Sequence, residues 1–407
     1  GYAVSEDGIH WEKPDLDLYR PVQRTINGGN KGPFPMKNIV MPYGMMDGLF
    51  YEPWEANPNK RYKAIVGMEA MKTDEDGRMT NEPAIISGWY LHWSPDGIRW
   101  QGDLSHPVLV ATGGYVFPIN GLGDTSTFWW DSIRKKYMGD AKLILYKPAR
   151  RCRGILESDD LIHWTRPRPA FYGREADHQI YGHNGFVYEK MYLGFRWVYD
   201  RSYMDFDKTV HAMGVELDCS RDGKIWTRVG AGQPFMALNP KRDTWDADEM
   251  KPIEPLIVND ELWIYYASRP SPAVFANIFA GKKGPRVQRQ DVYSTGLAKL
   301  RLDGFASLNG AEETGTVVTR PLTFKGKTLH INADVADGGE LVVGFRTRDG
   351  KKAVDGFVVE DCSPLTGDSI DMTVSWKSGE DISKLSGSFS RLEFKLRNAK
   401  IYSFWLE

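Results

Sequence analysis

Acidic side chains recur at four places where an apolar, strand-like stretch is about to begin. They are Asp47, Asp124, the pair Glu175 and Asp177, and Glu249. A neutral carboxyl group can donate a proton, and an ionised one can accept a proton or attack an electrophilic carbon. Two such groups facing one site would supply both halves of an acid-base reaction. Whether they meet depends on the elements that carry them.

A short motif, Ser-x-Asp-(Gly)-x-x-Trp, recurs along the chain and indicates those elements. Copies stand at residues 5–11, 94–100, 158–164 and 220–226, and a degenerate copy stands at 299–305. Each copy follows a β-like stretch, so we expect a hairpin in which Asp caps the turn, Gly supplies positive φ and Trp packs in the next strand. The spacing of roughly 60 to 90 residues suits four-stranded blades. We therefore interpret the motif as scaffold.

Upstream of the later copies, a hydrophobic strand, a polar turn and an aromatic strand follow one another, for example at 184–195 and 256–266. This pattern is typical of the inner half of a propeller blade. It predicts blades at about 36–105, 118–170, 175–232 and 243–310. The sequence begins directly on the strand before the first motif copy, so we expect the first blade to be incomplete.

The predicted fold class is all-β, a five-bladed β-propeller followed by a β-sandwich. The chain holds 41 Gly, 23 Pro, 14 Trp and 19 Tyr, a composition rich in turns and in side chains suited to strands. We assign the propeller to residues 1–312 as the catalytic domain. From residue 313 short alternating strands and fewer tryptophans predict an accessory sandwich over 313–407.

Composition also excludes several classes of partner. The 52 basic and 54 acidic residues give a formal net charge of −2, so no excess of positive charge is present for nucleic acid or an anionic membrane. No apolar run approaches the length of a membrane-spanning helix. The three cysteines stand far apart, which argues against a disulfide scaffold or a structural zinc site. We expect a secreted or periplasmic protein.

In a propeller the innermost strands converge on the axis, so side chains at their starts form a funnel. The four acidic positions are expected there. A protonated carboxyl that donates to a leaving oxygen, with a second carboxylate that attacks the anomeric carbon or activates water, is what glycosidic cleavage needs. The predicted partner is a carbohydrate substrate.

The segments around two of these positions resemble the five-bladed glycoside hydrolase superfamily that contains families 32, 43 and 68. The stretch 123–137 looks like their third-blade segment, and the resemblance implies that Asp124 stabilises the transition state. The stretch 177–188 is similar to their fourth-blade segment, where the general acid is a Glu. This chain has Asp177 there, so Asp177 and Glu249 are both candidates for the acid. Asp47 is a candidate for the nucleophile or base.

Further residues near these positions are expected to bind substrate. They are Glu175, His178, His183, Trp129, Arg196 and Trp245. Indole rings suit the apolar face of a sugar, and imidazole and guanidinium groups suit hydroxyl and anionic substituents. No cofactor is expected, although family 43 relatives imply a possible axial metal ion such as calcium.

Two other functions stay open from the sequence. The motif also resembles the Asp-box of sialidases, but those enzymes need an arginine trio that we cannot place. A non-catalytic carbohydrate-binding propeller is the alternative of another class. The resemblance implies that the family nucleophile lies in the first blade's inner strand, which we expect to be missing from this sequence.

Overall fold

The computed structural model describes residues 1–18, 37–41, 44–68, 86–110, 126–145, 150–174, 178–200, 212–239, 244–269 and 294–407. Strands dominate these residues, and the helices among them are short 3₁₀ turns, at Pro58–Lys60, Val229–Gly232, Val359–Asp361 and Ser383–Leu385. The all-β class is confirmed. No helix in these ranges is long and apolar enough to span a bilayer.

Two compact units divide the chain. One comprises residues 1–254 and 265–297, and the other comprises residues 255–264 and 298–407. The division at residue 312 into propeller and sandwich stays a prediction.

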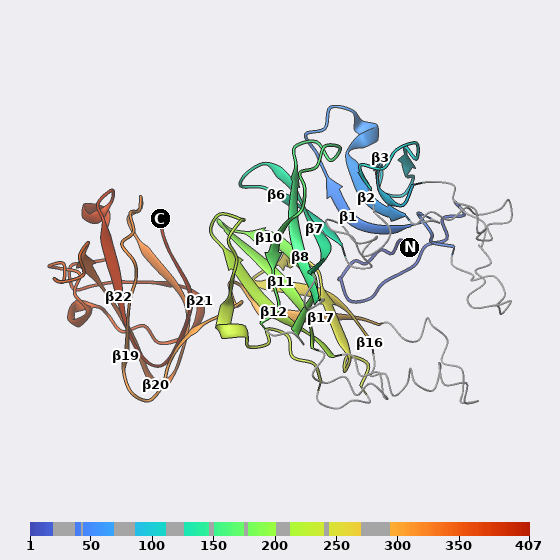
Figure 1. Ribbon diagram of the computed structural model, residues 1–407. Helices are drawn as coiled ribbons and strands as arrows, with labels where there is room; N and C mark the ends of the chain where they lie inside the picture. Colours follow the sequence, from blue (N-terminus) through green and yellow to red (C-terminus); the bar gives the residue numbers. More distant parts are fainter. Residues whose placement is uncertain are drawn as a thin grey trace. The chain divides into compact units, whose positions relative to one another are not determined.

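Two antiparallel meanders form the first sheet (Figure 1). Its strands are β1 (Met45–Tyr51), β2 (Tyr62–Met68), β3 (Gly88–Ser94), β4 (Gln101–Gly102), β5 (Leu109–Val110), β6 (Thr127–Asp131), β7 (Lys136–Leu145), β8 (Arg150–Ser158) and β9 (Arg168–Phe171). The order is β4-β3-β2-β1-β6-β7-β8-β9, with β5 beside β3. Strands β1 and β6 are parallel and meet at Gly48 and Phe128. The first strands of the two meanders are therefore neighbours.

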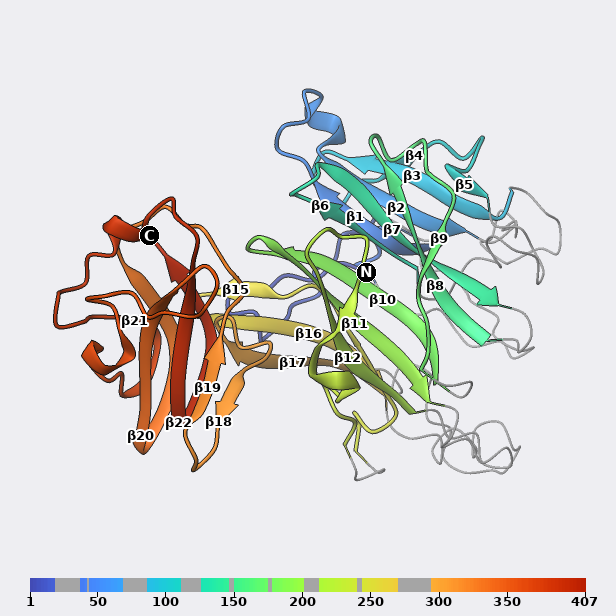
Figure 2. The same ribbon diagram turned by 60° about the vertical axis from the view of Figure 1, so that its left-hand side comes forward.

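The next sheet contains two further groups of strands. Its strands are β10 (His178–Tyr188), β11 (Met191–Asp200), β12 (Ala212–Ser220), β13 (Thr227–Arg228), β14 (Glu249–Pro252), β15 (Leu256–Val258), β16 (Glu261–Arg269) and β17 (Ser294–Arg301). Figure 2 shows β10, β11 and β12 side by side, as their antiparallel registers require. Strands β14 and β15 both pair with β16, which also pairs with β17. Each predicted blade span thus holds one group of successive strands, while the closure into five blades stays a prediction.

Glycines allow the first strands to approach one another. A Cβ on Gly48 of β1 would lie 2.6 Å from the Phe128 Cβ on β6, and one on Gly185 of β10 would lie 2.8 Å from the Trp129 ring. The Thr127 hydroxyl also donates to the His183 carbonyl at 2.6 Å, which joins β6 to β10. The large side chains of Phe128 and Trp129 on β6 therefore pack over glycine backbone on β1 and β10.

The four motif turns have the predicted geometry. In the turn after β3, Asp96 Oδ1 accepts the backbone N–H groups of Ile98 and Arg99 at 2.9 and 2.8 Å, and Trp100 Nε1 donates to the Gly97 carbonyl at 2.9 Å. Gly97 has φ +74°. The same bonds recur in the other three copies. The predicted turn geometry is confirmed, and the interpretation of these residues as scaffold stays a prediction.

The third copy departs from the pattern at one position, where Leu161 replaces Gly and still adopts φ +66°. This conformation is costly for a residue with a Cβ. Leu161 is fully buried against the cluster that contains Phe128 and Tyr137. Burial of its side chain offsets the backbone strain.

The first copy packs against the strands of the last group in the same unit. Trp11 meets Tyr265 of β16 edge to face with ring centroids 5.9 Å apart, and the Tyr265 hydroxyl donates to the Gly8 carbonyl at 2.6 Å. The first copy is thus placed by a strand more than two hundred residues away in sequence.

The second unit contains a five-stranded antiparallel sheet. Its strands are β18 (Leu308–Gly310), β19 (Gly315–Val318), β20 (Leu329–Thr347), β21 (Gly367–Thr373) and β22 (Ser390–Leu406), in the order β18-β22-β20-β21 with β19 beside β22. The long strands β20 and β22 pair along most of their length. Their apolar side chains and Trp376 form a single buried core. Its assignment as a sandwich stays a prediction.

Candidate functional site

The antiparallel registers divide each meander into two ends. In the first meander, Met45 of β1 pairs with Gly67 of β2, and Gly67 pairs with Trp89 of β3. At the other end Tyr51, Tyr62 and Ser94 are aligned. The motif turn follows Ser94, so the start of the first strand and the motif turn lie at opposite ends. We call the former the strand-start end.

Asp47 lies at the strand-start end of β1. Its carboxylate is half-buried and accepts the indole N–H of Trp89 at 2.7 Å. Because Gly48 pairs with Phe128, Asp47 lies beside the beginning of β6. Asp124 comes three residues before β6 in the sequence and lies outside the described residues. The start of β6 is nonetheless fixed next to Asp47.

The strand-start end of β10 begins with His178, which is half-buried. Glu175 and Asp177 precede it and lie outside the described residues. Tyr181 follows on the same strand and is also half-buried. The predicted fourth-blade segment therefore leads into a strand that lies next to β6.

Glu249 is the first residue of β14, and its side chain is almost completely buried. Its Oε1 lies 3.0 Å from Nζ of Lys251. The same ammonium lies 5.6 Å from the centre of the Tyr181 ring on β10. The parallel pairing of Met213 with Glu249 further fixes β14 beside β12. The start of β14 is therefore joined to the start of β10 through Lys251 and Tyr181.

A cluster of cations and tyrosines at this end was not among the predicted site residues. The guanidinium carbon of Arg151 on β8 lies 5.1 Å from the Tyr181 ring and 5.8 Å from the Tyr199 ring on β11. Together with Lys251, these residues come from four different strands. The adjacent arginines 150 and 151 at the start of a strand were a possible signal in the sequence, but the two tyrosines meet only through long-range pairing.

Two predicted substrate-binding residues lie in a buried network instead. Arg196 is 4% exposed, and its Nε donates to Asp218 Oδ2 at 2.8 Å. The His183 ring is stacked on Phe171, and its Nε2 lies 3.4 Å from the same carboxylate. Burial of Asp218 opposes its ionisation, but His183 and Arg196 outweigh this effect and lower its pKa. We therefore leave His183 and Arg196 out of the site proposed below.

The two predicted tryptophans differ in accessibility. Trp129 is 7% exposed because it packs on Gly185 and Tyr192. Trp245 is 42% exposed and stacks on Tyr266, with centroids 5.7 Å apart and planes inclined by 20°. Of the two, Trp245 is therefore the more accessible to a ligand. It precedes β14 by a few residues.

The described residues contain no group of three or more His, Cys, Asp or Glu side chains able to hold a metal ion. The groups that are present are carboxylates, two cations and several aromatic rings. Such a set can transfer protons, balance charge and bind a flat apolar face.

The chain was also compared with known protein families, sequences and structures. No protein-family model and no curated protein sequence matches the chain. Among solved structures, a β-1,2-mannobiose phosphorylase from Listeria innocua has a TM-score of 0.40 at 11% identity, over 66% of this chain and 75% of that chain. A thermostable family-43 glycoside hydrolase has a TM-score of 0.39 at 10% identity, over 63% and 68% respectively. An N-acetylgalactosamine deacetylase from F. plautii, in complex with blood group B trisaccharide, has a TM-score of 0.38 at 13% identity, over 65% and 91%.

Proposed function

We propose that the chain is a glycoside hydrolase that cleaves a poly- or oligosaccharide with carboxyl groups at the strand-start ends. The observation that carries this proposal is the recurrence of acidic residues at or just before the first strand of four successive groups. The described contacts support their convergence, since β1 pairs with β6, β6 bonds to β10, and Lys251 of β14 lies near Tyr181 of β10. Most glycoside hydrolases use a pair of carboxyl groups as their catalytic residues.

The proposed roles combine these contacts with the sequence resemblance. Asp124 stabilises the transition state, and Asp177 or Glu249 acts as general acid. Asp47 is the candidate nucleophile or base. Glu175 and His178 line the same end, and Trp245 offers its exposed face to a sugar ring. In this proposal residues 1–312 form a five-bladed propeller, and 313–407 form a sandwich.

The decisive experiment replaces one carboxylate while preserving its shape. Asp124→Asn should reduce kcat on the preferred polysaccharide by about 10²–10⁴-fold, the usual range for a group that assists proton transfer or stabilises charge. Reducing-end release is measured on a panel that contains neutral, uronate-bearing and sialylated glycans. A sialylated preference would favour the sialidase alternative.

The matched control is Asp159→Asn, which alters an exposed Asp whose only described partner is Lys136. Its activity should equal that of the wild type. If Asp124→Asn is as active as the control, the assignment of Asp124 is wrong. If the wild type binds glycans but releases no product from any of them, the non-catalytic propeller replaces the hydrolase.

A further inference from the structure

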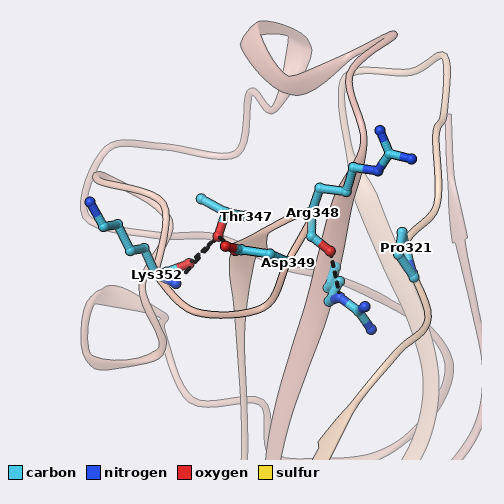
Figure 3. A pocket seen from close by; sticks show the side chains of 6 residues that line it. Pro321, Thr347, Arg348, Asp349 and Lys352 are labelled. Carbon is cyan, nitrogen blue, oxygen red and sulfur yellow. Dashed lines mark hydrogen bonds between the residues drawn. The ribbon is translucent and has the colours of Figure 1, made fainter.

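A pocket on the second unit is lined by a turn and two neighbouring strands (Figure 3). Its volume is about 580 Å³, and its lining residues are Pro321, Thr347, Arg348, Asp349, Lys352 and Arg391. The turn that begins at Thr347 follows the end of β20, and Arg391 lies near the start of β22. The pocket belongs to the second unit alone, so its geometry does not depend on the carboxylates of the first.

The turn is held by its own hydrogen bonds. Asp349 Oδ1 accepts the Thr347 hydroxyl at 2.6 Å and the Lys351 backbone N–H at 3.0 Å. These bonds, in that order of importance, lower the pKa of Asp349, and Arg391 adds a smaller effect. Gly350 adopts φ +76°, which closes the turn. This wall of the pocket is therefore preformed, since its bonds involve no ligand.

The cations in the pocket are not paired with carboxylates. Arg391 donates from Nε to the Arg348 carbonyl and from Nη1 to the Thr319 carbonyl, both at 2.8 Å, and the Arg348 guanidinium lies over the Phe389 ring at 4.7 Å. Neither guanidinium has an ion pair within the described residues. Lys352 adds a third, exposed positive charge. With Asp349 as the only lining carboxylate, the pocket carries an excess of positive charge.

A further carboxylate, on β22, is paired with a different arginine. Glu393 on β22 is buried and makes a bidentate pair with Arg346, at 2.7 Å for each oxygen. Arg346 therefore holds the strands together, whereas Arg348 and Arg391 have donors left over. Spare guanidinium donors suit planar or tetrahedral anions.

Apolar side chains lie in the pocket and next to one of its arginines. Pro321 lines the pocket and is exposed, and Phe389, which is not a lining residue, is 51% exposed and lies under the Arg348 guanidinium. Flat apolar faces next to charged donors suit a sugar ring that carries an anionic substituent. A phosphate or sulfate ion alone would leave these faces unused.

We propose that this pocket binds an anionic polysaccharide, with Arg348 and Arg391 contacting a carboxylate or sulfate group and Phe389 packing on the sugar ring. The choice of a saccharide rests on the proposed function, while the anionic preference rests on the pocket itself. The site would keep the polymer bound to the protein without taking part in bond cleavage.

The test measures binding of the full chain by calorimetry to polygalacturonate, a sulfated galactan, a fully methyl-esterified pectin and single-stranded DNA. The wild type should bind one or both anionic polysaccharides and should not bind the neutral pectin. Arg348→Gln should weaken binding about tenfold, because it removes one charge-assisted contact. Its side chain makes no described hydrogen bond, so the turn should remain intact. Added salt should weaken binding as well.

Arg397→Gln is the matched control, because Arg397 lies on the same strand as Arg391 but does not line the pocket. Its affinity should be unchanged, and melting temperatures should show that each variant is folded. Unchanged binding by both Arg348→Gln and Arg391→Lys, or equal binding of the neutral pectin, would overturn the proposal. Equally tight binding of DNA would overturn the saccharide assignment and indicate a general polyanion surface.

Failure of this site can be told apart from failure of the proposed function. Asp124→Asn should keep wild-type affinity for the anionic polymer while losing hydrolysis. Conversely, Arg348→Gln should keep wild-type kcat on a short oligosaccharide. Loss of both properties in either variant would contradict the separation of the two sites.

Discussion

At the end of β3, Asp96 is satisfied by backbone groups of its own turn, whereas at the start of β1, Asp47 receives its described hydrogen bond from Trp89 on another strand. Both are aspartates of the same meander, at opposite ends of it. The motif turn uses its carboxylate to fix the backbone. At the strand-start end, Asp47 instead contacts a residue more than forty positions away in the sequence.

The difference explains why the repeated residues are poor candidates for catalysis. Partial burial opposes ionisation of Asp96, but the N–H groups of Arg99 and Ile98 and the Ser94 hydroxyl outweigh it and lower its pKa to about 2. A carboxylate held in its charged form cannot act as a general acid near neutral pH. The proposed general acid is therefore sought among the acidic residues that do not repeat.

The largest expected effect at the strand-start end follows from Glu249→Gln. If Glu249 is the general acid, kcat should fall by about 10²–10⁴-fold. The variant also leaves Lys251 without its described carboxylate, so the melting temperature should fall as well. Both kcat and the folded fraction are measured, so that activity is expressed per folded molecule. Wild-type kcat in folded Glu249→Gln would transfer the acid role to Asp177.

The largest expected effect at the motif end concerns stability. Trp100 is 9% exposed and packs in the cluster of Val66 and Tyr90. Trp100→Ala should reduce the free energy of unfolding by about 3–5 kcal/mol, as for other buried aromatic truncations. Denaturant titration measures this loss, and kcat per folded molecule should be unchanged.

Trp11→Ala is the matched comparison, because Trp11 occupies the same motif position but is 51% exposed. Trp11→Ala should reduce the free energy of unfolding by clearly less than Trp100→Ala does. Equal losses in the free energy of unfolding for the two variants would show that the motif tryptophans stabilise the fold through the turn and not through burial.

The sequence predicted the motif turns well because their bonds are local. Ser94, Asp96 and Trp100 interact within seven consecutive positions, so their spacing alone encodes the geometry. The strand spans also agreed with prediction, because alternation and turn residues are likewise local signals. The all-β class and the strand groups were therefore accessible from the residues, whereas the five-bladed closure and the sandwich stay predictions.

The candidate site was less accessible because its contacts are long-range. Arg151 meets Tyr181 and Tyr199 only when β8, β10 and β11 are assembled, and no spacing in the sequence relates them. Arg196 looked equally available for substrate, yet it faces Asp218 on the adjacent strand. The sequence of one strand does not show whether a charged side chain on it will be paired with an opposite charge on the neighbouring strand.

The smallest expected effect tests the charge of a motif carboxylate directly. Asp96→Asn keeps an oxygen that can accept the turn N–H groups but removes the negative charge. At pH 7 the variant should be less stable than the wild type by about 1 kcal/mol, a typical value for one charge-assisted hydrogen bond near the surface.

The pH dependence of that difference follows from the direction of the shift. Because the folded-state pKa of Asp96 is about 2 and its ordinary value is 3.8, the charge stabilises the fold above about pH 4 and its contribution disappears as the pH falls towards 2. The gap between Asp96→Asn and the wild type should therefore close over this interval in thermal melts. Asp159→Asn, at an exposed position outside the turn bonds, should show no such closure. A gap that persists unchanged at pH 2.5 would mean that the turn depends on the shape of Asp96 and not on its charge, and the contrast with the strand-start carboxylates would then rest on geometry alone.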